Sequence, residues 1–250
     1  MRNKMKPELV ALLPMKGHSE RVPNKNLRDF NGKPLMYYIL NTLTQVDLIE
    51  NIYVDTDSDM IAEKVLEYFP TVKIIERPQE LRGDMISMND IIGYDLSVTQ
   101  ADYYLQTHST NPLLTPGTLK AGCQKFMDGL GAYDSLFSVT KLQTRLYNKD
   151  GHAVNHDPDN LIRTQDLEPL YEENSNFYIF SRTSFEVKHT RIGEKAQLLE
   201  MDPLEAIDID NESDFLLAEQ LYKLKRRQAG NEMESNGKRT LYDSGDRSFS

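Results

Sequence analysis

The sequence has very little cysteine and no long hydrophobic run. A single cysteine, Cys123, excludes an internal disulfide, and its amphipathic surroundings favour a buried thiol over a nucleophile. The apolar run from Leu9 to Leu13 is too short for a signal-peptide core or a membrane span, and no later run approaches that length. These absences predict a protein of the reducing cytoplasm with no membrane partner.

An excess of basic charge is also missing. The formal net charge is −10, which argues against a surface that grips nucleic acid, although a local basic pocket could still bind a nucleotide. The 250 residues suffice for one substantial core. We expect one domain over residues 1–227 and a polar tail without order over residues 228–250, which are rich in Gly, Ser, Asn and charge.

Hydrophobic periodicity indicates alternating strands and helices. Such βα units build a mostly parallel α/β sheet with helices on both faces, and ligands gather at the carboxyl ends of its strands. The expected strands are Leu9–Leu13, Asn51–Val54, Val72–Ile75, Tyr103–Gln106, Leu136–Thr140, Asn176–Phe180 and Ala206–Asp210. The expected helices are Pro34–Leu43, Met60–Tyr68, Ile91–Val98, Thr115–Met127 and Phe215–Leu224.

The alternation breaks after Thr140. The stretch Leu142–Tyr147, a turn at Asn148–Gly151 and a polar segment through Pro158 have the pattern of a hairpin arm rather than of another βα unit. This small appendage, with the segment that follows it, occupies about residues 141–175.

A loop with three cations, Pro14 to Asn26, directly follows the first expected strand. Gly17 permits close approach of the backbone, and Ser19 and backbone amides can donate to phosphate oxygens. The cations Lys16, Arg21 and Lys25 can balance the charge of a triphosphate. On composition alone, a solvated basic loop explains the segment equally well. The glycine spacing of a P-loop is absent.

This loop resembles the P-A-R-G-G-S-K-R-I-P-x-K-N signature of acylneuraminate cytidylyltransferases, the family of CMP-sialic acid synthetases. Lys16 replaces the usual Arg, His18 a Gly and Glu20 a Lys. A lysine keeps the charge but lacks the bidentate fork of arginine. The resemblance implies catalytic roles for the three cations, and a nucleotide site that includes Lys16, Gly17, Ser19 and Asn26.

Further segments match the same family in order. Arg77-Pro78-Gln79-Glu80-Leu81 with Asp84 and Ser87 resembles R-P-x-E-L-A-x-D-x-x-S, which implies that Arg77 and Ser87 belong to the nucleotide site. The family's L-Q-P-T-S-P-L-R turn is lengthened here, with Leu114 where Arg is usual. The R-x-Q-x-L-x-P and E-N-G-A-x-Y-I stretches also have counterparts. For the acidic sugar, these matches imply contacts from Gln106, Arg163, Gln165 and Asn174.

Two acidic pairs invite comparison with metal sites. Asp55-Thr56-Asp57 resembles the family's V-S-T-D-S element and also a glycosyltransferase D-x-D motif, although capping of the helix at Met60 explains it more simply. Asp208-Ile209-Asp210 would place both carboxylates on one face of a strand, where they repel unless a cation such as Mg²⁺ lies between them. The corresponding I-D-I-D-x-x-x-D-F element implies that Asp208 and Asp210 are catalytic and bind Mg²⁺.

The resemblance runs from about Val10 to Leu224 and implies a Rossmann-like fold. It also implies a homodimer in which the arm near Leu142–Asn160 crosses toward the partner. The implied reaction transfers CMP from CTP to the anomeric hydroxyl of an acidic nonulosonic sugar and releases pyrophosphate. The alternatives are another nucleotidyltransferase, a metal-dependent glycosyltransferase, or a catalytically silent nucleotide-binding homologue.

Overall fold

The structure is a computed structural model that describes residues 8–83 and 85–243, with side chains through Gln228. These residues form a seven-stranded sheet in the order β5-β4-β1-β6-β8-β7-β9. Four neighbouring pairs are parallel, whereas β8 runs antiparallel to β6 and to β7. The strands are β1 (Leu9–Met15), β4 (Asn51–Thr56), β5 (Lys73–Glu76), β6 (Tyr103–Thr107), β7 (Ser135–Leu142), β8 (Leu170–Ser181) and β9 (Ala196–Glu200). The predicted Rossmann-like, mostly parallel sheet is confirmed.

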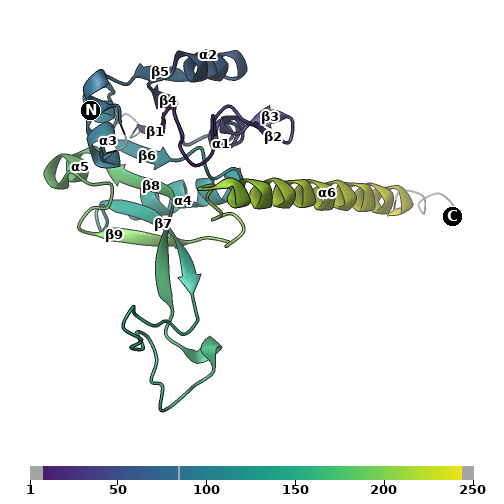
Figure 1. The fold of residues 1–250 in the computed structure, drawn as a ribbon. Coiled ribbons are helices and arrows are strands. Elements are labelled where there is room, and N and C mark those ends of the chain that lie inside the picture. Colours follow the sequence, from purple (N-terminus) through teal and green to yellow (C-terminus); the bar gives the residue numbers. More distant parts are fainter. Residues whose placement is uncertain (1–7, 84, 244–250) are drawn as a thin grey trace, which may run out of the picture.

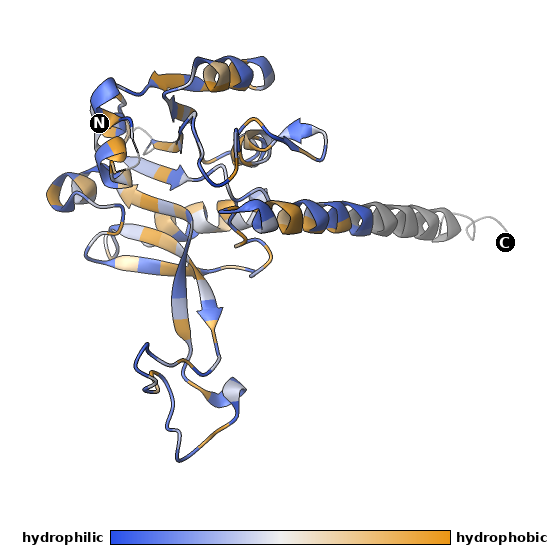
Figure 2. Ribbon diagram, in the orientation of Figure 1, coloured by the Kyte–Doolittle hydropathy of each residue, from blue (hydrophilic) through white to orange (hydrophobic). Residues whose placement is uncertain are grey.

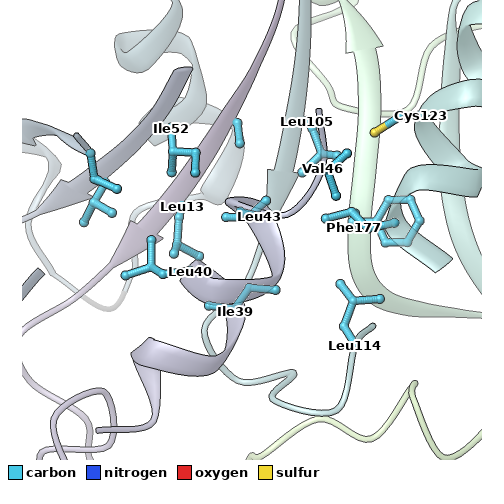
Figure 3. Close-up of a cluster of buried hydrophobic side chains, with 14 of the residues drawn as sticks. Leu13, Ile39, Leu40, Leu43, Val46, Ile52, Leu105, Leu114, Cys123 and Phe177 are labelled. Atoms are coloured by element: carbon cyan, nitrogen blue, oxygen red, sulfur yellow. The ribbon is translucent and has the colours of Figure 1, made fainter. Parts of the chain in front are cut away.

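Strand β1 is central, and all seven of its residues are buried. Leu13 and alternate residues along the strand pack into the larger core cluster, whereas Val10 and Leu12 join the smaller one. The larger cluster includes residues of α1 (Met36–Leu43), α2 (Asp59–Tyr68) and α4 (Pro116–Asp128), and Figure 3 shows Leu13 close to Ile39 and Leu40. The smaller cluster includes α3 (Met88–Val98) and α5 (Arg182–Lys188). Helices therefore cover both faces of the sheet.

A third cluster lies outside the sheet and joins an early segment of the chain, residues 22–38, to a late one, residues 207–222. It packs Phe30, in a small hairpin of β2 (Asp29–Phe30) and β3 (Lys33–Pro34), against Phe215 of α6 (Glu212–Asp243). Their rings meet edge to face, with the ring centroids 5.5 Å apart. Arg28 adds a bidentate ion pair with Glu212, at 2.5 and 2.6 Å. This cluster fixes the start of α6 beside the loop that follows β1.

The arm between β7 and β8 extends away from the sheet (Figure 1). It carries only one short helix, η2 (Thr164–Asp166), and an isolated bridge between Tyr147 and Ala153. The projecting segment thus runs between Leu142 and Leu170, within the stretch over which we expect an appendage.

Two expectations for the C-terminal part differ from the structure. No strand forms over Ala206–Asp210, because this segment pairs with no strand of the sheet; its one backbone bond toward the sheet in the described residues runs from Ile209 N to Thr110 O, which follows β6, at 2.9 Å. The edge strand is instead β9, which the sequence pattern did not reveal. Helix α6 continues to Asp243, past Leu224 and into the predicted tail, and it is largely hydrophilic where its hydropathy is shown (Figure 2). A helix makes its backbone hydrogen bonds internally, so α6 can continue past the residues that pack into the third cluster. Residues 244–250 of that predicted tail lie outside the described residues.

Cys123 is fully buried in α4, as expected, and burial raises the pKa of its thiol to about 12. No helix within the described ranges is long and apolar enough to cross a bilayer.

Gly122 in α4 provides a test of the packing between this helix and β8. A Cβ atom at this position would lie 2.7 Å from the buried ring of Phe177, whereas at the exposed Gly117 the nearest atom, Thr115 Oγ1, would be 3.8 Å away. We expect Gly122→Ala to lower the free energy of unfolding by about 1–3 kcal/mol through overpacking. Gly117→Ala should leave it unchanged or raise it. Urea denaturation of both variants measures this, and equal stabilities would contradict the close packing.

Candidate active site

A pocket of about 380 Å³ opens at the carboxyl ends of the parallel strands. Chain segments that follow three of these strands line it: Lys16 follows β1, Arg77 follows β5 and His108 follows β6. Strand order reverses between β1 and β6, and such switch points commonly bind ligands. We refer to the loop over residues 14–26, which is predicted to bind phosphate, as the phosphate loop. It supplies much of the lining of this pocket, including Lys16, Ser19, Arg21, Lys25 and Asn26, so we call the pocket the loop-side pocket.

The cations of this pocket meet the acidic segment from the other end of the chain. Arg21 forms an exposed ion pair with Asp210 at 2.9 Å. Lys25 donates from Nζ to the carbonyl oxygen of Ile209 at 2.7 Å. Burial lowers the pKa of Lys25, and the charges of Asp208 and Asp210 oppose that shift. Lys16, Arg21, Lys25 and Asp210 line this pocket, and Lys16 and Asp208 lie close enough to Lys25 to act on its charge, so the structure brings together the five residues that we predicted to be catalytic.

Asp208 faces a second pocket, of about 340 Å³, on the other side of the same segment. We call it the hairpin-side pocket, because Thr140 of β7 and residues 172–175 of β8 line it. Asp208 Oδ1 is buried and makes no hydrogen bond to the part of the chain that the structure describes. Burial, with a contribution from Asp210, raises the pKa of Asp208. Asp210 lines the loop-side pocket, so the Asp208–Asp210 segment separates the two pockets.

The phosphate loop is anchored through its backbone. Gly17 N donates to Asp57 Oδ1 at 2.6 Å, and Asn26 Nδ2 donates to Lys16 O at 3.0 Å. Asn26 also accepts a hydrogen bond from Ser109 at 2.6 Å. The interpretation of Asp55 and Asp57 as helix caps is wrong: Ser58 is the N-cap of α2, because its hydroxyl is the group that reaches the backbone amide of Ile61.

Arg77 lines the loop-side pocket, and the buried carboxylate of Asp55 balances its charge. Its Nε donates to Asp55 Oδ1 at 2.5 Å, and both side chains are almost completely buried. Ser87, by contrast, is the N-cap of α3 and bonds to Asp90. Its neighbours Ile86 and Met88 line the pocket instead.

Of the predicted sugar residues, two lie near the pockets and two do not. Asn174 lines the hairpin-side pocket and bonds to Ser138 and Thr140. Gln106 is buried beneath His108, which lines the loop-side pocket. Arg163 and Gln165 lie on the arm, where Arg163 forms an exposed bidentate pair with Asp166 at 2.7 and 3.0 Å.

The sequence interpretation missed Arg191 and Asp95. Arg191 stacks 3.9 Å above the ring of Tyr178 and donates to Gln106 Oε1. Burial, together with Arg191 and Lys25, lowers the pKa of His108 to about 3, so this imidazole is neutral at pH 7. No sequence motif marks Arg191, which lies 85 positions after its partner Gln106. Asp95 does have a sequence signal, since it is a carboxylate on the buried face of a helix, among Ile91, Ile92 and Leu96.

Known proteins resemble this chain in sequence. The model of the cytidylyltransferase family matches residues 10–239. The chain is 24% identical over 231 residues to the pseudaminic acid cytidylyltransferase of Campylobacter jejuni, with 88% of this chain and 98% of that protein covered. It is 29% identical to the N-acylneuraminate cytidylyltransferase of Oncorhynchus mykiss over 222 residues, which cover 86% of this chain and 50% of that protein.

Solved structures share the fold. A CMP:2-keto-3-deoxy-manno-octonic acid synthetase complexed with CTP superimposes with a TM-score of 0.64 at 16% identity, covering 87% of this chain and 99% of that one. A 4-diphosphocytidyl-2C-methyl-D-erythritol synthase from Anaerococcus prevotii gives 0.61 at 13% identity, covering 87% and 96%. Together, the match of the family model and the shared fold show that this chain belongs to the cytidylyltransferase family. The predicted class of enzyme is thus confirmed at the level of a CTP-dependent cytidylyltransferase.

Gly17 allows a test of the anchored loop. A Cβ atom at this position would lie 2.8 Å from Ser58 Cβ. We expect Gly17→Ala to displace the loop and to lower kcat/KM for CTP roughly tenfold, because small misplacements of binding groups are costly. Adding Ser58→Gly removes the obstructing atom and should restore most of the loss, whereas Ser58→Gly alone is the control. Steady-state kinetics of the three variants decides, and an unimpaired Gly17→Ala enzyme would contradict the role of the loop.

Proposed function

We propose that this protein transfers CMP from CTP to the anomeric hydroxyl of an acidic nonulosonic sugar and releases pyrophosphate. The observation that carries the proposal is the meeting of a cationic loop with two carboxylates between two pockets. The loop-side pocket would hold CTP, whose triphosphate suits Lys16, Arg21 and Lys25. The hairpin-side pocket would hold the sugar next to Asp208. The names of the relatives, which include sialic and pseudaminic acid enzymes, support an acidic sugar of this class.

Mg²⁺ is the expected cofactor, and the residues fit it. Asp208 and Asp210 offer hard carboxylate oxygens, and Asp208 Oδ1 is buried without a hydrogen-bond partner among the described residues. No cluster of three or more His, Cys, Asp or Glu side chains suited to a metal occurs in the described ranges, so phosphate oxygens of CTP would have to complete the coordination. When bound, Mg²⁺ would neutralise charge that develops on the phosphates.

The residues of this chain account for the remaining steps. Arg21 and Lys16 would stabilise the charge of the leaving pyrophosphate. Lys25, fixed on the Ile209 carbonyl, would hold its ammonium group between the two carboxylates and the α-phosphate. Asp208 lines the hairpin-side pocket, so it would be placed to accept the proton of the anomeric hydroxyl.

We also propose that two copies associate through the arm. Large apolar side chains are exposed along it, namely Tyr147, Val154, Leu161, Ile162, Leu170 and Tyr171. A concentration of exposed apolar groups on one projection is typical of a protein interface. A second copy would cover them and would bring Arg163 and Gln165 of its own arm toward the sugar. This arrangement would give the sugar carboxylate its cation, which the hairpin-side pocket of one chain lacks among its lining residues.

The direct test of the function is pyrophosphate release from CTP and Mg²⁺ with a panel of acidic sugars: N-acetylneuraminate, pseudaminate, legionaminate and a Kdo-like acid. We expect turnover with one of them and CMP-sugar as the product. Transfer from a nucleotide-sugar donor would favour a glycosyltransferase instead. Binding of CTP with no turnover across the panel would favour a silent homologue.

Asp208→Asn and Asp210→Asn should each lower kcat on the order of 100-fold, because the amide keeps the shape but removes charge needed at the reaction centre. The exposed Asp202, in the preceding loop, gives the matched control, Asp202→Asn. Pyrophosphate release is followed while Mg²⁺ is titrated, since high Mg²⁺ should partly restore a variant that only binds the metal weakly. Parental rates and Mg²⁺ dependence in both folded variants would remove this pair from the site.

Arg163→Lys should raise KM for the sugar roughly tenfold and leave KM for CTP unchanged, because charge remains but the planar fork is lost. Lys149→Ala, at the exposed turn of the same arm, serves as the control. The measurement is steady-state kinetics with each substrate varied in turn. Unaltered sugar KM and kcat in Arg163→Lys would reject a bidentate contact with the sugar carboxylate.

A further inference from the structure

A buried carboxyl pair lies beneath the loop-side pocket. Asp95 of α3 and Asp55 of β4 are 0% and 1% exposed, and Arg77, which pairs with Asp55, is 4% exposed. Three carboxyl oxygens of this group make no hydrogen bond to a donor in the described residues: both oxygens of Asp95 and Oδ2 of Asp55. Orphaned buried acceptors are costly, so the group needs another source of hydrogen bonding.

A single proton on one of the two carboxyl groups provides the missing hydrogen bond. Two neighbouring carboxylates that are both ionised repel strongly in a buried site, whereas a proton shared between them turns one acid into a donor to the other. The charges then balance, because one negative charge faces the one positive charge of Arg77. The charged groups that act on Asp95 are Asp55 from β4 and Arg77 from the segment after β5. Burial, followed by the charge and hydrogen bond of Asp55, raises the pKa of Asp95 to about 9, and Arg77 only partly opposes this.

We propose that Asp95 is a positioning residue: it carries a proton that it shares with Asp55, and this proton-bridged pair fixes the guanidinium of Arg77 at the wall of the loop-side pocket. The proposal rests on the proposed function in one respect, namely that CTP occupies this pocket.

The geometry of Arg77 explains why the proton matters. Its Nε is held by Asp55 Oδ1, its Nη2 makes only a long contact of 3.4 Å to the Asp55 carbonyl, and Nη1 has no hydrogen bond to a described residue. Donors therefore remain for an acceptor in the pocket, such as a carbonyl or hydroxyl of the nucleoside. The backbone of Arg77 is held as well, because Arg82 Nε donates to the Arg77 carbonyl oxygen at 2.8 Å. An ionised Asp95 would compete for the guanidinium and draw it away from the pocket.

Two substitutions separate the proton from the charge. Asp95→Asn keeps the shape and provides an N–H donor to Asp55, but it cannot ionise. We expect its KM for CTP and its kcat at pH 7 to stay within about twofold of the parent. Asp95→Ala leaves Asp55 Oδ2 without a donor, and we expect KM for CTP to rise roughly tenfold with a smaller change in kcat. If Asp95 were instead an ionised partner of Arg77, Asp95→Asn would be impaired as much as Asp95→Ala, and the proposal would be wrong.

The pH profile gives a second readout. As the pH rises through the pKa of Asp95, the parent should lose more affinity for CTP than Asp95→Asn in titration calorimetry, because Lys25, whose pKa burial also lowers, titrates in both proteins. Thermal melting at each pH shows that both proteins remain folded. A parallel decline of parent and Asp95→Asn would overturn the positioning role.

An infrared difference spectrum tests the proton without any substrate. The parent minus Asp95→Asn spectrum at neutral pH should contain the carbonyl stretch of a protonated carboxylic acid, and absence of that band refutes the shared proton. This result stands whether or not the enzyme uses CTP, so it separates failure of the carboxyl pair from failure of the proposed function. A band together with parental CTP binding in Asp95→Ala would overturn the positioning role while leaving the proton in place.

Discussion

The site depends on how one residue, Ile209, is held. Its side chain is fully buried in the third cluster with Phe30 and Phe215. Its backbone N–H bonds to Thr110 O and its carbonyl accepts from Lys25, so the backbone is fixed from two sides. The carboxylates on either side of it, Asp208 and Asp210, are thereby placed without a strand ladder to support them. Burial of one apolar side chain sets the position of two charged ones.

The third cluster also joins the segment that contains Ile209 to the early part of the chain. The edge-to-face contacts of Phe30 and the ion pair of Arg28 with Glu212 join residues about 185 positions apart in the chain. They hold the start of α6 against the hairpin of β2 and β3. Without that contact, only the backbone hydrogen bonds of Ile209 and the pair itself would hold Asp210 beside Arg21.

Most of the sheet could be predicted from sequence, since a strand such as β1 carries its own signal of continuous apolar residues and α2 carries helical spacing. The predicted strand over Ala206–Asp210 does not form, and the reason is physical. Alternation of apolar and acidic residues indicates an extended backbone, but it does not indicate whether a neighbouring strand is there to pair with it. The segments that form the pocket were also predictable, because parallel strands bring their carboxyl ends to one edge. The contacts of Asp95 with Asp55 and of Arg191 with Gln106 were not, because they arise only when distant elements pack.

The Asp208–Asp210 segment forms a partition with an opening on either side, and this has a consequence for the order of events. In the proposed reaction each substrate would enter by its own opening, so neither has to leave before the other arrives. The two would meet at the edge of the partition in a ternary complex, and the cytidylyl group would pass directly from CTP to the sugar hydroxyl as pyrophosphate leaves. Kinetics of the sequential type follow from that geometry, with no need for a nucleotide attached to the enzyme between two half-reactions.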